Sequence, residues 1–360
     1  MGNSKLNMDL QQRINAFIKL GIFLKDFLNE KSSESYLNTN KVGFSKELHN
    51  IVNLAKHHNG WFTEDNVLFA ISGWAEALSE VNLNKWVSTY TFSEKLPKTI
   101  AVIMAGNIPL VGFHDFLTVL ISGNKVLAKL SSNDKQLLPI LSKYLVSIEP
   151  EFENLIDFTD KKLEGFDAVI ATGSNNTARY FEYYFGKYPH IIRKNRNSIA
   201  VLTGNETPKQ MEALANDIFR YFGLGCRNVS KIYVPENYNF DNFFGGIFAW
   251  KEIINNAKYI NNYDYNKAVY LMGSLDLLDN EFMLLKEDKG FSSPIAVIFY
   301  ETYKSLTEIN KTIKAETENI QAIVSNAGID GEIDFGKAQK PELWDFADGV
   351  DTLDFLLKLP

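Results

Sequence analysis

Cysteine is almost absent from this sequence of 360 residues, in which Cys226 is the only one. A single thiol excludes an intramolecular disulfide and is typical of a protein from a reducing compartment. A lone cysteine is more often a small buried hydrophobic residue than a nucleophile. This one stands in the segment FGLGCRNVSK, between two glycines and an arginine, so the rest of the sequence has to decide between the two roles.

An excess of basic charge is also missing, because the formal net charge is -7. Nucleic-acid binding needs a concentrated basic surface, so we do not expect a general nucleic-acid binder. The N-terminal segment MGNSKLNMDL lacks the basic region, apolar core and cleavage site of a signal peptide. The longest apolar region, residues 99–123, contains four residues that a lipid-facing helix tolerates poorly, namely Asn107, Pro109, His114 and Asp115. We therefore expect a cytoplasmic protein without an integral membrane segment.

The order of the expected elements indicates an α/β fold with a helical N-terminal region. Apolar residues recur at near-helical spacing in residues 8–28 and 64–81. Beyond Pro97, short strands rich in β-branched residues alternate with helices, a pattern typical of βαβ units around a parallel sheet. Strands are expected at residues 99–105, 125–130, 165–174, 198–202, 231–235 and 293–300, with one helix opened by Pro109 and another by Thr207 and Pro208.

The turns that follow these strands are the candidate ligand sites, because open α/β sheets bind ligands where their parallel strands end. Asn107 follows the first strand, Lys129 stands at the end of the second, and Gly173 with Ser174 stands at the end of a third. An asparagine amide can donate to an oxyanion, a lysine can reach a ribose hydroxyl or a phosphate, and a helix start suits a phosphate. Each also has a purely structural interpretation, as a turn or capping residue or as a solvated lysine.

The order of these turns, followed by a glycine-flanked cysteine, resembles the aldehyde dehydrogenase superfamily. Three segments are similar to its fatty acyl-CoA or acyl-ACP reductases of the bioluminescence type: AGNIPLVGFHDFLTVLISGNKVLAKLSSND, FGLGCRNVSKIYVP and FGKAQKPELWDFADGVDTLDFL. The resemblance runs from about Pro97 to the C-terminus and more loosely across the helical N-terminus. It implies a Rossmann-like cofactor domain and an α/β catalytic domain.

The resemblance also implies a division of the chain and a role for each candidate residue. A helical region, a nucleotide cofactor domain, a catalytic cysteine domain and a C-terminal tail are expected at residues 1–95, 96–204, 205–330 and 331–360. Cys226 would be the nucleophile, and Asn107 with the Cys226 backbone N–H would form the oxyanion site. Lys129 would contact the adenosine ribose, and Ser174, beside Gly173, the pyrophosphate. No metal-binding residue is assigned.

Departures from the superfamily pattern refine this expectation. Aldehyde-oxidising members have a Glu-Leu-Gly-Gly segment whose glutamate activates water, whereas the matching stretch here, RKNRNSIAVL, contains no acid. Hydrolysis of an acyl-enzyme should then be slow, which favours a CoA-linked enzyme. Ser132 stands where NAD-preferring members often have glutamate, so it removes repulsion toward a 2′-phosphate and favours NADPH. The acid that usually binds the nicotinamide ribose is missing from KGFSSPIAV, so the pattern does not assign nicotinamide positioning.

Two further polar residues have alternative interpretations. His114, two helical turns beyond Asn107, is either a packed helix histidine or, with Asp115, a proton donor to departing CoA or a polar group beside the acyl channel. Glu206 precedes the helix start at Thr207, where carboxylates are common because of the helix dipole, and it is a weaker candidate for a substitute base.

The function implied by the resemblance is NADPH-dependent reduction of a fatty acyl-CoA or acyl-ACP thioester to the aldehyde, through an acyl-cysteine thioester. One alternative is a CoA-acylating aldehyde dehydrogenase that oxidises short aldehydes. Another is a nucleotide-binding or acyl-transferring subunit that does not reduce its substrate. The partners that this implies are the acyl thioester, an acyl carrier protein or an acyl-transferring subunit, and further copies of the chain in a homo-oligomer.

Overall fold

The computed structural model describes residues 8–30, 39–93 and 95–360. The described residues form two compact units. Unit 1 consists of Met1–Lys194 and Glu342–Pro360, and unit 2 of Asn195–Pro341. This division differs from the expected one in two respects. The boundary after the cofactor domain lies at residue 194 instead of 204, and the last 19 residues of the expected tail belong to unit 1.

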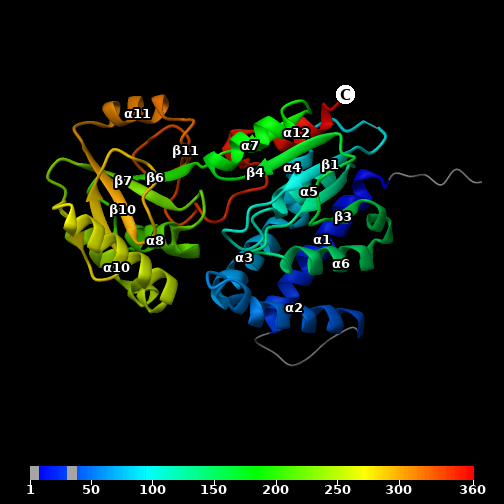
Figure 1. The fold of residues 1–360 in the computed structure, drawn as a ribbon, viewed down its shortest axis with the longest axis horizontal. Coiled ribbons are helices and arrows are strands. Elements are labelled where there is room, and N and C mark those ends of the chain that lie inside the picture. Colours follow the sequence, from blue (N-terminus) through cyan, green and yellow to red (C-terminus); the bar gives the residue numbers. More distant parts are fainter. Residues whose placement is uncertain (1–7, 31–38, 94) are drawn as a thin grey trace, which may run out of the picture. The chain divides into compact units, whose positions relative to one another are not determined.

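Unit 1 combines a parallel sheet with the N-terminal helices (Figure 1). The elements before the sheet are α1 (Leu10–Glu30), α2 (Thr39–His58), α3 (Glu64–Ala77) and α4 (Glu80–Val87). The elements of the sheet region are β1 (Thr99–Ile103), α5 (Phe113–Ile121), β2 (Lys125–Lys129), α6 (Leu137–Ile148), η1 (Pro150–Asn154), β3 (Ile156–Phe158), β4 (Ala168–Thr172), α7 (Asn175–Phe185) and β5 (His190–Arg193). The C-terminal segment adds η4 (Ala347–Gly349) and α12 (Thr352–Leu357).

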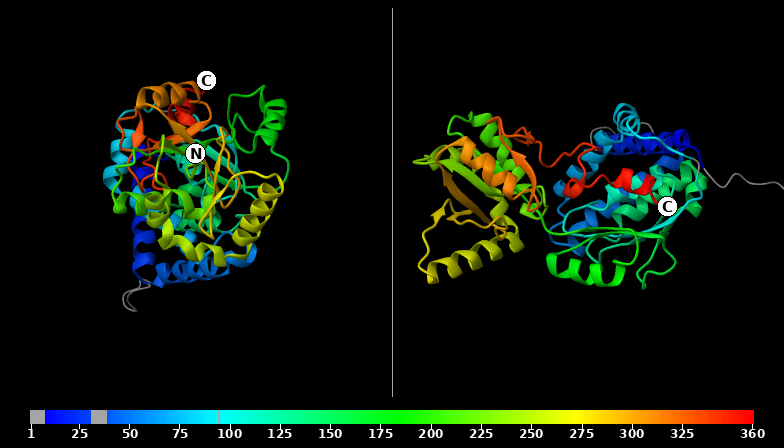
Figure 2. Two further views of the ribbon diagram at one scale, coloured as in Figure 1. Left: turned by 90° about the vertical axis from the view of Figure 1, so that its left-hand side faces the viewer. Right: turned by 90° about the horizontal axis from the view of Figure 1, so that it is seen from above.

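Helices cover both faces of the unit 1 sheet, whose strand order is β3-β2-β1-β4-β5. Successive side chains of a strand point to opposite faces. Ile100 and Val102 of β1 therefore pack into the cluster formed with the N-terminal helices, α5 and α6, whereas Ala101 and Ile103 pack on the side of α7. Figure 2 shows α7 on one side of the sheet and the N-terminal helices on the other. The chain winds outward in both directions from β1 and β4, so the topological switch point lies between these two strands.

The helix expected over residues 64–81 is interrupted. Thr63 caps α3 and Ser79 caps α4, each side chain accepting a hydrogen bond from the backbone N–H three residues further on. A serine hydroxyl stabilises a helix start more than a helix interior. Ser79 therefore ends one helix region and begins the next.

Unit 2 is a second α/β unit. Its elements are β6 (Asn197–Val201), α8 (Pro208–Phe219), η2 (Arg220–Gly223), β7 (Val229–Pro235), α9 (Phe240–Ile247), η3 (Phe248–Asn255), α10 (Ala257–Met272), β8 (Leu278–Asp279), β9 (Leu284–Glu287), β10 (Val297–Tyr303), α11 (Leu306–Ala315), β11 (Ile320–Val324) and β12 (Glu332–Ile333). Helix α8 begins at Pro208 as expected, with a reciprocal cap between Thr207 and Gln210.

The sheet of unit 2 has the order β12-β11-β6-β7-β10-β9-β8, and its strand pairs are parallel except for β8 with β9. Helix α11 lies on one face of this sheet, where Ile309 and Ile313 pack against Ile199 and Val201. Figure 1 shows α8 and α10 on the opposite face. In the described ranges, no helix has the length and apolar character needed to cross a bilayer.

Candidate active site

The cysteine loop, residues 220–228, joins helix α8 to strand β7. Tyr221, Phe222 and Gly223 have left-handed backbone, with φ angles of 56°, 58° and 75°. Residues with a side chain rarely adopt this conformation, and each instance costs on the order of 1–3 kcal/mol. Because both aromatic side chains are buried, their packing offsets this cost. The loop that carries Cys226 is therefore held in a conformation that a free chain would avoid.

Asn228 holds the cysteine loop from inside and is only 2% exposed. Its Oδ1 accepts a hydrogen bond from the Gly225 N–H at 2.8 Å, and its own N–H donates to the Gly225 carbonyl at 3.0 Å. Its Nδ2 donates at 2.8 to 3.2 Å to three carbonyl oxygens at and just beyond the end of α8, those of Asp217, Ile218 and Arg220. One side chain thus ties the end of a helix to the residue that precedes Cys226.

Ser198 holds the backbone of Cys226 itself. Its Oγ, on strand β6, donates to the Cys226 carbonyl oxygen at 3.0 Å. Ser198 is completely buried, whereas Cys226 is exposed. The interpretation of Cys226 as a small buried hydrophobic residue is therefore wrong. An anchored backbone that presents an exposed thiol is an arrangement that suits a nucleophile.

Asp217 connects the same end of α8 to the segment that follows β12. Its buried carboxylate accepts hydrogen bonds from the backbone N–H groups of Gly336 at 2.6 Å and Ala338 at 3.0 Å. Burial raises the pKa of Asp217 to about 7, although the two N–H donors act in the opposite direction. The FGKAQK part of the C-terminal segment thus docks next to the helix end that Asn228 holds.

Glu206 has structural partners that explain its position. Its Oε1 accepts hydrogen bonds from the Thr203 N–H at 2.5 Å and the Thr203 hydroxyl at 2.8 Å, and its Oε2 accepts one from the Gly204 N–H at 3.0 Å. These bonds stabilise the turn between β6 and α8. They favour the structural interpretation over that of a substitute base.

In unit 1, Asn107 lies exposed on the loop that follows β1. The expectation of a helix opened by Pro109 is wrong, because α5 begins only at Phe113. Leu110 has a φ of 57°, which a right-handed helix does not allow, and its N–H donates to Asp134 Oδ2 at 3.1 Å. The loop after β1 is therefore attached to the turn after β2.

Close packing joins the same two turns at a second place. A Cβ atom on Gly106 would lie 2.3 Å from Ser131 Oγ, so only glycine fits there. Ser132 is exposed on the turn after β2. At the end of β2, Lys129 is half-buried and its Nζ donates to the Lys161 carbonyl at 2.9 Å. The Lys129 side chain is thus held at the strand end by a hydrogen bond, whereas a lysine that is merely solvated would have none.

Ser174 caps helix α7, directly after strand β4. Its Oγ accepts a hydrogen bond from the Thr177 N–H at 3.3 Å and lies 2.9 Å from Thr177 Oγ1. A Cβ atom on Gly173 would lie 3.0 Å from the side chains of Thr177 and Phe181, so glycine permits the close approach of strand and helix. The capping interpretation of Ser174 is confirmed, and its contact with a pyrophosphate stays a prediction.

The carboxyl edge of the unit 1 sheet is the place where open α/β sheets bind ligands. The Asn107 loop follows β1 and the Gly173 turn follows β4, and these neighbouring strands flank the switch point. The N-terminus of a helix such as α7 favours an anion. Asn107, Lys129, Ser132 and Ser174 belong to unit 1, and Cys226 belongs to unit 2. Within the described residues, no group of three or more His, Cys, Asp or Glu side chains is arranged to hold a metal ion.

His114, on α5, packs among aromatic rings that come from other segments. Its Nε2 lies 3.0 Å from the Leu343 carbonyl oxygen, and its Nδ1 lies 3.5 Å from Thr118 Oγ1. Its ring centroid is 5.8 to 6.5 Å from those of three aromatic residues, Trp74, Trp86 and Phe346. These contacts match the interpretation as a packed helix histidine, and the catalytic role of His114 stays a prediction.

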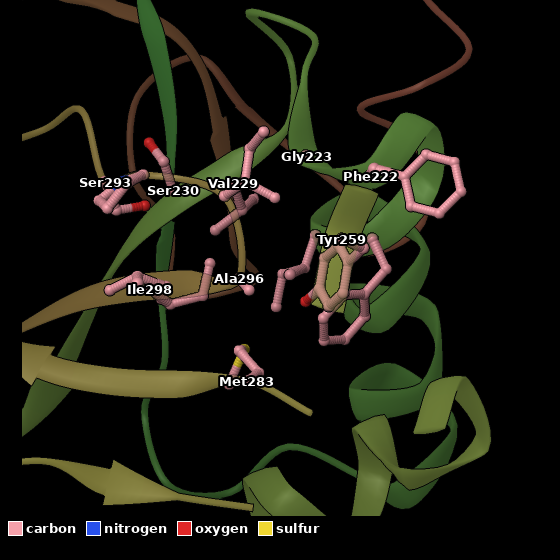
Figure 3. A pocket seen from close by; sticks show the side chains of 14 residues that line it. Phe222, Gly223, Val229, Ser230, Tyr259, Met283, Ser293, Ala296 and Ile298 are labelled. Carbon is pink, nitrogen blue, oxygen red and sulfur yellow. The ribbon is translucent and has the colours of Figure 1, made fainter. Parts of the chain in front are cut away.

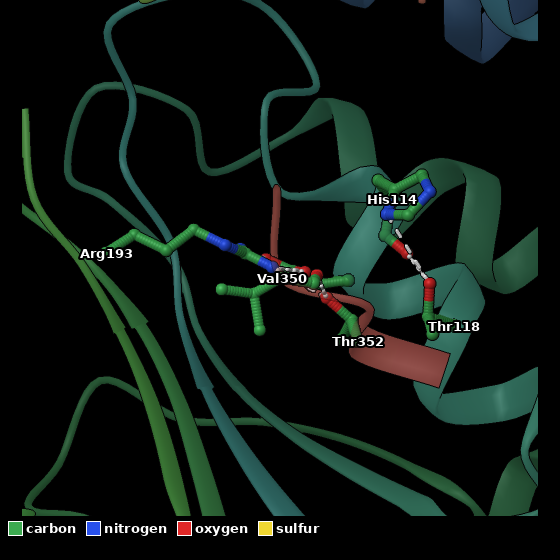
Figure 4. Close-up of polar contacts among 6 residues, drawn as sticks. His114, Thr118, Arg193, Val350 and Thr352 are labelled. Carbon is green, nitrogen blue, oxygen red and sulfur yellow. Dashed lines mark hydrogen bonds and ion pairs between the residues drawn. The ribbon is translucent and has the colours of Figure 1, made fainter. Parts of the chain in front are cut away.

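Asp115 forms a buried ion pair with Arg193, with N to O distances of 2.5 and 2.8 Å. The same guanidinium donates to Thr352 Oγ1 at 3.0 Å (Figure 4). The network thus joins α5, the end of β5 and α12. A carboxylate bonded in this bidentate way supports the fold of unit 1 more directly than it supports proton transfer.

Three residues of the cysteine region were missed by sequence reasoning, namely Ser198, Asp217 and Asn228. The asparagine two positions after the cysteine is visible in the letters CRN, but its carbonyl partners lie 8 to 11 residues earlier. No spacing rule connects these positions, because the contact exists only once α8 has turned back through the left-handed residues.

Comparison with known proteins gives the family and the fold. The family described as Acyl-CoA reductase (LuxC) matches residues 43–243, more than half of the chain. Aldehyde dehydrogenase 21 from Physcomitrella patens, solved with the reaction product succinate, aligns with a TM-score of 0.64 and 13% identity, covering 98% of this chain and 89% of its own. The aldehyde dehydrogenase KauB from Pseudomonas aeruginosa aligns with a TM-score of 0.62 and 12% identity, covering 88% and 72%. No curated protein sequence matches the chain significantly.

The fold is therefore that of the aldehyde dehydrogenases, and the expected α/β architecture is confirmed. The protein belongs to the acyl-CoA reductase (LuxC) family. Membership of this family supports an oxidoreductase that acts on acyl-CoA.

Proposed function

We propose that the protein reduces a fatty acyl thioester of CoA or of an acyl carrier protein to the aldehyde, with NADPH, through an acyl-cysteine at Cys226. The observation that carries this proposal is the cysteine loop, where buried Asn228 and Ser198 fix the backbone around an exposed thiol. Membership of the acyl-CoA reductase family supports an acyl-CoA as the substrate class.

In the first step, the Cys226 thiolate attacks the thioester carbonyl carbon. A new carbon–sulfur bond forms, the bond to the CoA sulfur breaks, and CoA leaves as a thiolate. Asn107 and the Cys226 backbone N–H donate hydrogen bonds to the oxyanion while it carries charge. The product is an acyl-cysteine.

The second step reduces the acyl-cysteine, and NADPH, when bound, would supply the hydride for its carbonyl carbon. Asn107 again donates to the oxygen as it becomes a thiohemiacetal oxyanion. Collapse breaks the bond to Cys226, which leaves as a thiolate, and the aldehyde is released. We assign the adenosine ribose to Lys129, the pyrophosphate to Ser174 at the start of α7, and the 2′-phosphate to the exposed turn at Ser132.

Reduction has to be faster than hydrolysis of the acyl-cysteine. The stretch from Arg193 to Leu202 contains no carboxylate, and the side chain of Arg193 is bonded to Asp115. Ser198 from the same stretch donates to the Cys226 carbonyl. Without a general base at this place, attack by water on the acyl-cysteine is slow, which supports the reductive route.

Turnover with a long-chain acyl-CoA and NADPH tests the proposal. We expect aldehyde to form in step with NADPH oxidation, and Cys226→Ser to abolish both, because serine is a poor nucleophile at its ordinary pKa. The melting temperature of the variant should match that of the parent, since the exposed side chain contributes little to packing. Aldehyde formation by Cys226→Ser at the parent rate would contradict the proposal.

A further inference from the structure

A pocket in unit 2 is lined in part by residues that flank Cys226 (Figure 3). Gly223 precedes the cysteine by three residues, Val229 follows it by three, and both line the pocket. Consecutive Cα atoms are 3.8 Å apart, so each of these residues lies within about 11 Å of the Cys226 Cα. A chain of several carbons bonded to the Cys226 sulfur spans such a distance.

The walls of this pocket carry no charge among the described residues. The lining residues come from the end of α8, the cysteine loop, the start of β7, helix α10, the residue before β9 and the segment that enters β10. They are aliphatic, aromatic or small. An uncharged pocket does not suit phosphate or carboxylate groups, because an ion loses its hydration there. Of the parts of an acyl-CoA, the acyl chain is the uncharged one. The pocket therefore suits the acyl chain.

The pocket is not purely apolar, because the Tyr259 hydroxyl belongs to its wall. Tyr259, on α10, is 1% exposed, and its oxygen has no hydrogen-bond partner within the described part of the chain. Figure 3 shows this oxygen directed into the pocket. Burial raises the pKa of Tyr259 far above its ordinary value, so the group stays protonated and able to donate. A buried hydroxyl without a partner is unfavourable, and a ligand oxygen would satisfy it.

The size of the pocket limits what can reach this hydroxyl. Its volume is about 30 Å³, and a single water molecule needs about 10–15 Å³ of a cavity measured in this way. The space beside Tyr259 therefore takes one or two small groups of a bound chain. A carbon that carries a hydroxyl or a carbonyl oxygen matches both the size of the pocket and the polarity of the Tyr259 hydroxyl.

We propose that this pocket binds an oxygen-bearing part of the acyl chain, so that the enzyme prefers hydroxyacyl or oxoacyl thioesters to unsubstituted acyl thioesters of the same length. This inference rests on the proposed function, because the acyl chain reaches the pocket from Cys226. Tyr259 is the specificity-determining residue, since it contacts the oxygen that distinguishes the two substrate classes.

Acylation of Cys226 by hexanoyl-CoA and by its hydroxylated isomers tests the inference. We expect at least one isomer to exceed hexanoyl-CoA in the second-order rate of acylation by about tenfold, the effect of one well-placed hydrogen bond. Tyr259→Phe keeps the ring and removes only the oxygen. It should bring the ratio of the two second-order rates, hydroxylated isomer over hexanoyl-CoA, down to about one.

Tyr263→Phe is the matched control, one helical turn further along α10. The Tyr263 hydroxyl donates to Asp279 Oδ1 at 2.6 Å, so its removal should lower the melting temperature and leave the substrate preference intact. Tyr259→Phe should leave the melting temperature unchanged or raise it, because the oxygen that it removes is unpartnered.

Two results would overturn the inference alone: no isomer surpasses hexanoyl-CoA, or the preference survives in Tyr259→Phe. A lower melting temperature for Tyr259→Phe without any substrate preference would show that the pocket holds a water molecule instead. Failure of every thioester to acylate Cys226 is a different outcome, which would overturn the proposed function together with the inference.

Discussion

The reactivity that we assign to Cys226 depends on residues that do not touch the substrate. Asn228 bonds to both backbone polar groups of Gly225, and Ser198 bonds to the carbonyl of Cys226. The left-handed backbone before the loop cannot relax while these bonds hold. Asn228 is therefore a positioning residue for the nucleophile.

Replacement of Asn228 should slow acylation more than it weakens substrate binding. Asn228→Asp places an oxygen in front of the carbonyl oxygens of Asp217, Ile218 and Arg220, which repel it. Asn228→Ala removes the three hydrogen bonds to these carbonyls. We expect the maximal acylation rate to fall by at least about tenfold, with a loss of unfolding free energy of about 1–3 kcal/mol. The half-saturating concentration of acyl-CoA should stay nearly constant. Single-turnover kinetics of Cys226 acylation measure both quantities.

A buried asparagine elsewhere provides the control for this experiment. Asn124 is 8% exposed, donates to Ser122 Oγ at 2.9 Å and accepts from the Lys98 N–H at 3.0 Å. Asn124→Ala should cost similar stability and keep the parent acylation rate. If Asn228→Ala behaves in the same way as Asn124→Ala, Asn228 has only a structural role.

At the residue scale, the sequence indicated the candidate catalytic and binding residues but not the residues that position them. Asn107, Lys129 and Ser174 stand out because they lie where expected strands end, and Cys226 because it is the only cysteine and lies next to glycines. Asn228 does not, because its role arises from contacts with a helix end that the loop has to turn back to meet. The aromatic and carbonyl neighbours of His114 also come from distant segments, so the sequence left its two interpretations open.

At the scale of elements, the turn after β2 carries the cofactor preference that we propose. Ser132 is exposed on this turn, close in sequence to Lys129 at the strand end. Ser132→Glu should lower kcat/KM for NADPH by about tenfold or more, because like charges about 4 Å apart repel by about 1–4 kcal/mol depending on exposure. The value for NADH should remain within a factor of about two, a change of less than 1 kcal/mol. Steady-state kinetics with both cofactors test this prediction.

Ser132→Gln has nearly the same size as Ser132→Glu but no charge, so it separates repulsion from steric hindrance. We expect it to retain most of the parent preference. An equal loss in both variants would remove the electrostatic explanation and leave the bulk of the side chain as the cause.

The contact between α8 and the segment after β12 predicts a pH-dependent stability. Burial raises the pKa of Asp217 from 3.8 to about 7, so the folded protein keeps a proton that the unfolded chain loses. The contribution of protonated Asp217 to the free energy of unfolding is complete below about pH 4 and is lost as the pH rises to about 7. The total loss is up to about 4 kcal/mol, because each pKa unit corresponds to about 1.36 kcal/mol. Denaturant unfolding of the parent and Asp217→Asn between pH 4 and 8 measures the difference. Parallel curves for the two proteins would contradict the prediction.

The alternation of strands and helices was enough to predict the α/β class, because short β-branched runs and amphipathic stretches reflect local burial. The start of α8 was predicted as well, since Thr207, Pro208 and Gln210 form a local cap. The helix expected at Pro109 was a wrong prediction. Proline is also compatible with an irregular loop, and here the hydrogen bond between Leu110 and Asp134 stabilises such a loop. Local patterns therefore predicted elements, and contacts between turns decided how each strand ends.

At the scale of the whole molecule, the chain closes unit 1 with residues that come after unit 2. Tyr90 donates to Asp351 across 261 positions, and His114 meets Leu343 across 229. Leu353 and Leu356 of α12 are buried in the unit 1 core. Such distant pairings leave no periodic pattern, which is why the last segment was expected as a separate tail.

Mass spectrometry of the intact protein after incubation with a long-chain acyl-CoA tests the acyl-cysteine most directly. The protein should gain the mass of one acyl group in the absence of NADPH and lose it again when NADPH is added, with release of the aldehyde. Cys226→Ser should gain no mass. An unmodified parent protein that nevertheless forms aldehyde, or an adduct that NADPH leaves in place, would contradict the mechanism.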